Sequence, residues 1–426
     1  MSGSSPLLNV RSSRATSASG QEEEKDVMTT AWVICDSDSY LKWGAVRAAE
    51  MRDAGYDVQL YVVDNAVAPS ASQIEAALAG QAAAPRWTTY ANLTVALPAA
   101  APDVLLLACR GPMLELIVKL IADAADRPVV VAGIPGIWMP PTRKGLRYRR
   151  AVDVLVVHSV REEIAVQERL PFARIERTGI ASLVAGPAAA PGRYRDHIVF
   201  APQALVPREE AQRVEVLQGL VDVAAHHPDT PVILKLRGRA DEAQTHAEAY
   251  PYPELAEAHG IELPANVVVG YGSLADYLDS CRGFVTVSST AVLEAASAGV
   301  PVLCIDDFGV SALNINSVFE GSGFFGSLEE LRRLEFPQPN ADWLAENYLH
   351  PESRNNWLAV VAAALAARSR GELSRVPASR GGGVSGVFRR VRDRAIALGE
   401  TDTGARRALA RVLRPIDHAW RTVRHR

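Results

Sequence analysis

Stretches rich in Val, Leu and Ile alternate with Ala-rich amphipathic stretches from residue 31 to residue 306. The apolar stretches show little polar alternation, which is typical of strands that are buried on both faces of a parallel sheet under a cover of helices. Repeated strand–helix order of this kind predicts the α/β class. The predicted strands cover 31–35, 57–63, 103–109, 128–133, 153–158, 197–202, 231–237, 266–271, 283–289 and 301–306.

A segment rich in Ala, Pro and Gly, residues 181–196, interrupts this pattern and divides the strands into two series. It therefore predicts two facing Rossmann-like domains, whose ligands would lie at the carboxyl ends of the strands. Helices are predicted at 41–54, 70–80, 114–126, 208–226, 274–280 and 291–298, and a helix at 354–367 is expected to close the second domain. The predicted division is a disordered tail at 1–27, domains at 28–190 and 195–368, and a linker with a basic tail at 369–426.

Composition and charge exclude several classes of protein. With 48% hydrophobic residues the chain can bury a core, and its net charge of −4 does not predict a partner nucleic acid. No apolar run is long enough to span a bilayer, and the N-terminus lacks the apolar region of a secretory signal. The four cysteines lie far apart and mostly end apolar runs, so we expect buried, reduced thiols and a cytoplasmic protein.

The modest net charge hides an asymmetry between the body and the C-terminal tail. Residues 380–426 contain twelve arginines and four acidic residues, a net charge of +8, so the remainder of the chain carries −12. Two amphipathic stretches, 384–398 and 405–424, lie within this tail, and the second contains Trp420. A basic amphipathic helix with a tryptophan suits an anionic membrane surface. A helix packed on the body, or a solvated tail, would have the same pattern.

The most specific segment is GFVTVSSTAVLEAASAGVPVLCIDDFG at 283–309. Ser288, Ser289 and Thr290 lie between a buried strand and a predicted helix, where free backbone N–H groups and the helix dipole favour a phosphate. Glu294 follows one helical turn later on the same face, where it could bind a ribose or sugar hydroxyl. Ser and Thr are equally the ordinary capping residues of a helix, so a purely structural role stays open.

The pattern V-S-S-T-x-x-x-E-A-x-x-x-G-V-P-V resembles the donor site of GT-B glycosyltransferases. It is similar to the double-serine motif of bacterial capsule sialyl- and Kdo-transferases, and more closely to an uncharacterised actinobacterial family of proposed glycosyltransferases. The resemblance implies that residues 288–290 hold the donor phosphate and that Glu294 binds donor hydroxyls. It also implies transfer of a sugar from a nucleotide-sugar to a hydroxyl of a cell-envelope glycan or lipid-linked acceptor, with no metal or other cofactor.

One departure concerns the second strand of the second domain. Capsule sialyltransferases carry a His-Pro pair after this strand, whereas this chain reads LKLRGR at 234–239, which puts a CMP-type donor in doubt. Lys235 and Arg237 share one face of the strand end and could contact phosphate or base. His246 in the following loop could replace the missing histidine, and Tyr271 after the next strand could stack on the base.

In the first domain, the candidate catalytic bases follow predicted strands. Asp36 and Asp38 leave the first strand, and either carboxylate could deprotonate an acceptor hydroxyl. His158 ends another strand and is an alternative base, while Arg110 and Gly133–Gly136 join the same rim. The competing functions are a nucleotide-sugar epimerase, a polyol-phosphate transferase, and a non-catalytic glycan- or nucleotide-binding protein, all of the same fold.

Overall fold

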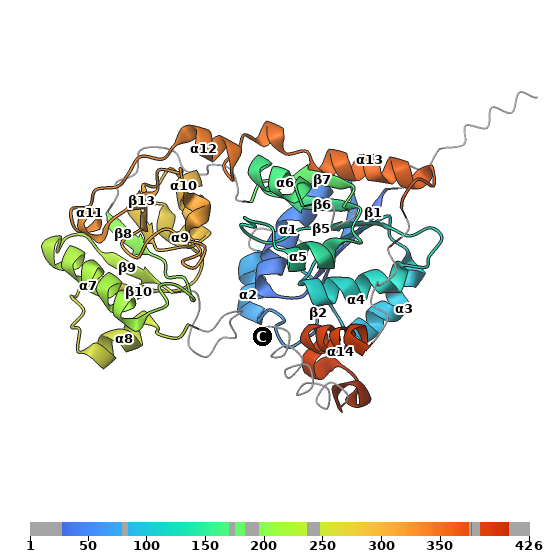
Figure 1. Cartoon of the computed structure of the whole chain (residues 1–426), viewed down its shortest axis with the longest axis horizontal. Coiled ribbons are helices and arrows are strands. Elements are labelled where there is room, and N and C mark those ends of the chain that lie inside the picture. Colours follow the sequence, from blue (N-terminus) through green and yellow to red (C-terminus); the bar gives the residue numbers. More distant parts are fainter. Residues whose placement is uncertain are drawn as a thin grey trace, which may run out of the picture.

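The computed structural model describes residues 28–78, 84–169, 175–183, 196–236, 248–374, 376 and 384–408. The described chain forms two lobes, each built around a parallel sheet (Figure 1). The first sheet contains β1 (Thr30–Cys35), β2 (Asp57–Val63), β3 (Arg86–Thr88), β4 (Val104–Ala108), β5 (Val129–Ala132), β6 (Val154–Val157) and β7 (Arg177–Ile180). The second contains β8 (His197–Phe200), β9 (Val232–Lys235), β10 (Val267–Gly270), β11 (Cys281–Thr286), β12 (Val302–Ile305) and β13 (Phe325–Gly326).

Both sheets have the strand order of a Rossmann-like domain. The first runs β3-β2-β1-β4-β5-β6-β7 and the second β10-β9-β8-β11-β12-β13. The direction of the winding reverses between β1 and β4 and again between β8 and β11. Open α/β sheets bind ligands beyond the carboxyl ends of the strands at such reversal points. The predicted α/β fold of two Rossmann-like domains, of GT-B type, is therefore confirmed, and all ten predicted strands are present.

Helices cover both faces of each sheet. In the first domain these are α1 (Asp38–Asp53), α2 (Ala71–Ala77), α3 (Tyr90–Ala100), α4 (Gly111–Ile121), α5 (Arg143–Arg149) and α6 (Val160–Gln167). The second series contains α7 (Glu210–His226), α8 (Tyr252–His259), α9 (Ala275–Leu278), α10 (Ala291–Ser297), η2 (Ser317–Phe319), α11 (Leu328–Arg332) and α12 (Ala341–Glu346). The chain ends with η3 (Glu352–Arg354), α13 (Trp357–Ser369), α14 (Val384–Leu398) and η4 (Gly399–Thr401). All four cysteines are buried free thiols, as predicted.

Helix α13 returns to the first domain instead of closing the second, so that expectation is wrong. Trp357, Val361 and Ala364 belong to the apolar core on one face of the first sheet. A Cβ atom at Gly179 would lie 2.6 Å from the Cα atom of Trp357, so only glycine lets β7 and α13 approach this closely. The side chain of Asn356 also accepts a hydrogen bond from the backbone N–H of Ile180 at 2.7 Å.

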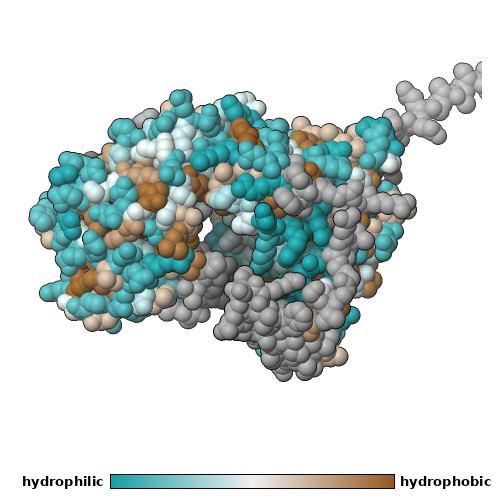
Figure 2. Space-filling view, viewed as in Figure 1, coloured by the Kyte–Doolittle hydropathy of each residue, from teal (hydrophilic) through white to brown (hydrophobic). Residues whose placement is uncertain are grey.

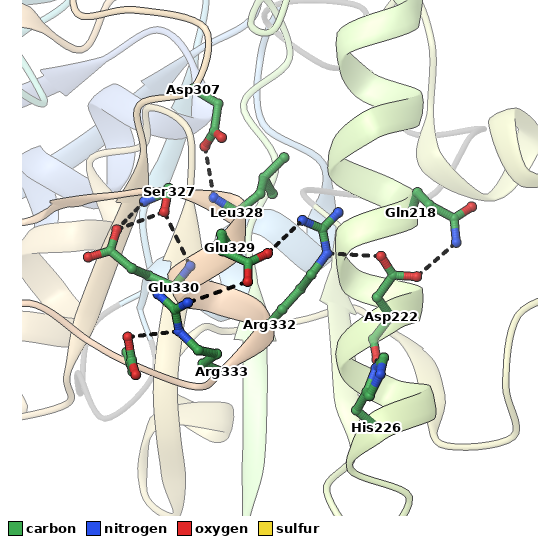
Figure 3. Close-up of polar contacts among 11 residues, drawn as sticks. Gln218, Asp222, His226, Asp307, Ser327, Leu328, Glu329, Glu330, Arg332 and Arg333 are labelled. Carbon is green, nitrogen blue, oxygen red and sulfur yellow. Dashed lines mark hydrogen bonds and ion pairs between the residues drawn. The ribbon is translucent and has the colours of Figure 1, made fainter.

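Helices α11 and α7 lie in the second lobe (Figure 1), and Figure 3 shows the polar contacts that fix α11 against α7. Ser327 and Glu330 form a capping box at the start of α11, and Asp307 accepts a hydrogen bond from the N–H of Leu328 at 2.8 Å. The Nε atom of Arg332 contacts Asp222 of α7 at 2.9 Å. These contacts anchor the chain that leaves β12 through Asp307.

The first basic amphipathic stretch is helical, as predicted, and packs on the first domain below α4 (Figure 1). Ala397 and Leu398 are fully buried in the core of this domain. Arg394 forms two hydrogen bonds of 2.8 Å with Asp402. Most of the second stretch, from residue 409, lies outside the described residues. Among the described helices, none has the length and hydrophobicity needed to cross a membrane.

Candidate functional site

The carboxyl ends of the two sheets face each other across the junction of the domains. A Cβ atom at Gly136, in the loop after β5, would lie 3.7 Å from the Cγ2 atom of Thr290 at the tip of α10. This separation is an ordinary van der Waals contact, and glycine is favoured at this position by its φ of +135°. Figure 2 shows a hollow between the two lobes. The loop after β5 in the first domain therefore lies against the turn after β11 in the second.

Glu294 of α10 is at the centre of a cluster of charges from both domains. Its side chain is exposed, but desolvation by the surrounding protein raises the pKa of its carboxyl. The positive charges of Lys42 and Lys235 act in the opposite direction on the same pKa. Lys235 is buried at the end of β9, with its Nζ atom 2.8 Å from the carbonyl oxygen of Leu236. The structure thus brings the predicted Glu294 and Lys235 together and adds Lys42, which we did not predict.

Asp38 begins α1 beside Lys42. The Nζ atom of Lys42 lies 3.0 Å from the Oδ2 atom of Asp38 in an i,i+4 ion pair. The other carboxylate oxygen, Oδ1, is buried and has no hydrogen-bond donor among the described residues. Asp38 is therefore an oriented carboxylate whose Oδ1 atom is unpaired among these residues and closed to solvent, and a role as general base requires that an acceptor reach it.

Asp36, the other candidate carboxylate, is fully buried in an ion pair with Arg110. Its two oxygens accept from the backbone N–H and the Nε atom of Arg110 at 3.0 and 2.9 Å. Burial raises the pKa of Asp36, and the guanidinium of Arg110 opposes this shift. Asn65 accepts from the Nη2 atom of Arg110 at 3.1 Å. Because Asp36 holds Arg110 at the reversal point of the first sheet, its position argues for a positioning role and against contact with an acceptor.

His158 is in the core, which argues against its role as an alternative base. Trp43 donates from Nε1 to the Nε2 atom of His158 at 2.9 Å, so the ring proton is on Nδ1, 2.8 Å from the carbonyl oxygen of Ala181. Burial lowers the pKa of His158 to about 4, with a smaller contribution from Arg47. A neutral ring with both nitrogens occupied has no place for a substrate proton.

The three hydroxyl residues of the turn after β11 have different environments. Ser288 is 4% exposed, and its Oγ atom donates to the carbonyl oxygen of Ile315 at 2.7 Å. Ser289 accepts from the N–H of Ala291 at 3.3 Å and so serves as a local cap. Thr290 is exposed at the N-cap position of α10 and makes no side-chain capping bond. Thr290 is therefore the hydroxyl that is open to a ligand, whereas Ser288 is turned toward the loop after β12.

The remaining predicted donor residues are more distant or not described. Tyr271 follows β10, three strands from β11, at a separation of about 14 Å across the sheet. Its backbone N–H and carbonyl both bond the hydroxyl of Tyr277, at 3.1 and 2.7 Å. Arg237 and His246 lie outside the described residues.

A cavity that the sequence did not indicate opens after β8. It has a volume of about 260 Å³ and is lined by Ala204, Leu205, Pro207, Arg208, Arg213, Ala249 and Tyr250. Arg213 is buried and fixes the loop by donating to the carbonyl oxygens of Pro207, Gln203 and Ala204, at 2.8, 3.1 and 2.9 Å. The only trace of this arrangement in the sequence is an arginine within the apolar pattern of α7.

Comparisons with known proteins give one family and a fold. The model of the family described as "Putative glycosyltransferase (DUF6716)" matches residues 31–364. The structure of S. aureus MnaA with UDP has a TM-score of 0.51 and 9% identity, covering 83% of this chain and all of that one. UDP-GlcNAc 2-epimerase from Neisseria meningitidis bound to UDP-GlcNAc has a TM-score of 0.50 and 10% identity, covering 79% and 99%. Identities this low show the fold alone. A search of curated protein sequences gives no significant match.

Proposed function

Because this chain belongs to the family described as "Putative glycosyltransferase (DUF6716)", we propose that it moves a sugar from a nucleotide-sugar donor to an acceptor hydroxyl. The observation that carries this proposal is the charge cluster between the domains. Asp38 and Lys42 come from the first domain, and Glu294 and Lys235 come from the second. A transferase needs both an acceptor base and cationic groups for a leaving phosphate, and this cluster supplies both.

In the proposed reaction, the acceptor hydroxyl gives its proton to the carboxylate of Asp38. Its oxygen forms a bond to the anomeric carbon of the sugar while the bond from that carbon to the phosphate breaks. Lys42, Lys235 and the N-terminal end of α10 at Thr290 stabilise the leaving phosphate without a metal ion. Glu294 binds a donor hydroxyl, and the cavity after β8 takes part of the donor beyond the phosphates. The cell-envelope acceptor stays a proposal from the family resemblance.

Isothermal titration of the full-length protein with CMP, UDP, GDP and ADP tests the donor site. We expect one nucleotide to bind, and the Glu294→Ala variant to bind it about 1.5–3 kcal/mol more weakly, because a charged hydrogen bond is lost. Glu254→Ala is the matched control, since Glu254 is an exposed first-turn glutamate of α8 in the same domain. Equal affinity of wild-type and Glu294→Ala would remove the donor-site assignment. Conversion of a nucleotide-sugar to its epimer without any acceptor would identify an epimerase instead.

We also propose that residues 380–426 hold the enzyme at an anionic membrane surface, near a lipid-linked or growing glycan. The net charge of +8 in this segment supports it. Helix α14 keeps Val387 and Ile396 exposed at 46% and 48% although it packs on the first domain. Apolar side chains next to arginines suit the boundary between lipid headgroups and acyl chains. The enzyme would then work at the inner face of the cytoplasmic membrane.

Deletion of residues 409–426 tests this membrane contact, whereas deletion of all of residues 380–426 would also affect the fold. Ala397 and Leu398 lie in the core of the first domain, so a longer deletion would also destabilise the fold. The segment 409–426 contains five arginines, each worth about 1 kcal/mol near an anionic surface. We expect the shortened protein to lose at least about tenfold in flotation with phosphatidylglycerol vesicles. Its nucleotide affinity should not change. Undiminished vesicle binding would refute the contact.

A further inference from the structure

The loop between β12 and η2 presents apolar side chains to solvent at the carboxyl edge of the second sheet. Val310, Leu313 and Ile315 are 36%, 60% and 40% exposed. The loop lies directly beside the turn after β11, because the Oγ atom of Ser288 donates to the carbonyl oxygen of Ile315 at 2.7 Å. The hollow between the lobes has hydrophobic surface along its edge on the second domain (Figure 2).

The backbone at Ile315 is in a conformation that β-branched residues rarely adopt. Its φ is +58°, in the left-handed region. Two other non-glycine residues of the described part have a positive φ: Ala101 caps the end of α3, and Leu334 lies just after α11. Left-handed residues are common at helix ends, where they satisfy the last carbonyl groups. Ile315 does not end a helix, so its strain needs another explanation.

Polar side chains inside the loop maintain this strained conformation. Asn316 is fully buried, accepts from the N–H of Ser311 at 2.9 Å, and donates to the carbonyl oxygen of Gly309 at 3.2 Å. Asn314 donates to the carbonyl oxygen of Phe308 at 2.8 Å. The amide side chains therefore bond the backbone within the loop, while three apolar side chains extend into solvent. In an ordinary surface loop the polar side chains face solvent and the apolar ones are covered, so this loop has the opposite arrangement.

An apolar ridge at this place has no counterpart in the phosphates and hydroxyls of a nucleotide-sugar, and the proposed function places the rest of the donor in the cavity after β8. The acceptor must approach the same turn to reach the sugar, so the apolar surface matches the acceptor. We propose that residues 308–316 bind the hydrocarbon part of an amphiphilic acceptor, so that the enzyme glycosylates a lipid-linked molecule. This inference rests on the proposed glycosyltransferase function. It narrows the acceptor to the lipid-linked class and adds the loop that selects it.

Binding of octyl and dodecyl maltoside below their micelle concentrations tests this inference, with maltose as the reference. Each buried methylene raises the affinity by up to about fourfold. We expect the wild-type protein to bind dodecyl maltoside at least about tenfold more tightly than octyl maltoside. The double variant Val310→Ser/Leu313→Ser should lose most of this dependence on chain length. Val95→Ser is the matched control, because Val95 is 72% exposed on α3 in the first domain.

A second variant separates the side chain from the backbone. Ile315→Gly keeps the left-handed conformation without strain and removes one apolar group, so it should fold normally and show a smaller dependence on chain length. An unchanged dependence in both loop variants would overturn the inference. The loop variants could instead lose vesicle binding while their affinity for monomeric maltosides stays unchanged. That result would show that the loop contacts a bilayer, and it would also overturn the inference. The loop variants should bind the nucleotide with the affinity of the wild-type protein. A loss of nucleotide affinity would concern the donor site, and therefore the proposed function, and not the acceptor.

Discussion

The Asp38→Asn variant should transfer sugar about 10²–10⁴-fold more slowly than the wild-type protein. Asparagine has the same shape as aspartate but cannot take the proton of an acceptor hydroxyl. Among the described residues, the Oδ1 atom of Asp38 is buried without a donor, while Oδ2 is fixed by Lys42 at 3.0 Å, so the variant removes a base and one surface ion pair. The fold and the nucleotide affinity should stay near wild-type. The rate of donor hydrolysis measures the effect where the acceptor is not yet known.

Asp36→Asn is the informative comparison for this prediction. Asp36 is wholly buried against Arg110, so its variant should lose stability, with any loss of activity following from a displaced Arg110. Thermal unfolding and kcat measured together distinguish the two carboxylates. If the Asp36→Asn protein is stable and has a lower kcat than the Asp38→Asn protein, Asp36 is the base and Asp38 the positioning residue. An Asp38→Asn protein within about threefold of the wild-type rate would exclude Asp38 as the base.

The sequence predicted the strands that are buried on both faces. It did not predict elements whose existence or position is determined by contacts with distant parts of the chain. The five apolar strands of each series are recognisable because Val, Leu and Ile fill them. The edge strands β3 and β7 read RWT and RTGI and have no apolar run to distinguish them. The apolar face of α13 indicates burial but does not indicate which sheet it meets. Gly179 decides this, through a contact with Trp357 across 178 positions of sequence.

The site shows the same division. Glu294 and Lys235 were predictable because their places follow from a helix turn and a strand end. Ser288 and His158 also lie at strand ends, but distant carbonyl groups of Ile315 and Ala181 occupy their polar atoms. No local pattern reveals such tertiary partners. The sequence contained one indication for Lys42, its i,i+4 spacing from Asp38. This spacing predicts an ion pair within a helix, but it does not predict a partner in the other domain.

The Glu162→Ala variant should lose about 3–5 kcal/mol of unfolding free energy. The carboxylate of Glu162 is 1% exposed and accepts three hydrogen bonds: from the N–H groups of Trp138 and His158, at 2.7 and 2.9 Å, and from the hydroxyl of Tyr348, at 2.9 Å. Tyr348 packs with the core of the second domain, so Glu162 connects the two domains. Alanine would leave three buried donors without an acceptor. Denaturant unfolding measures the loss.

Two milder variants show whether the loss comes from these donors. Tyr348→Phe removes one hydrogen bond to a charged group and should cost about 1.5–3 kcal/mol. Burial raises the pKa of Glu162, so the folded state binds its proton more tightly than the unfolded state does. The resulting stabilisation is complete below the unfolded pKa and is lost as the pH rises through the raised pKa. The wild-type unfolding free energy should therefore fall over that window relative to Glu162→Gln, which cannot titrate. A loss below about 1 kcal/mol in Glu162→Ala would mean that water replaces the carboxylate and that the domains are joined elsewhere.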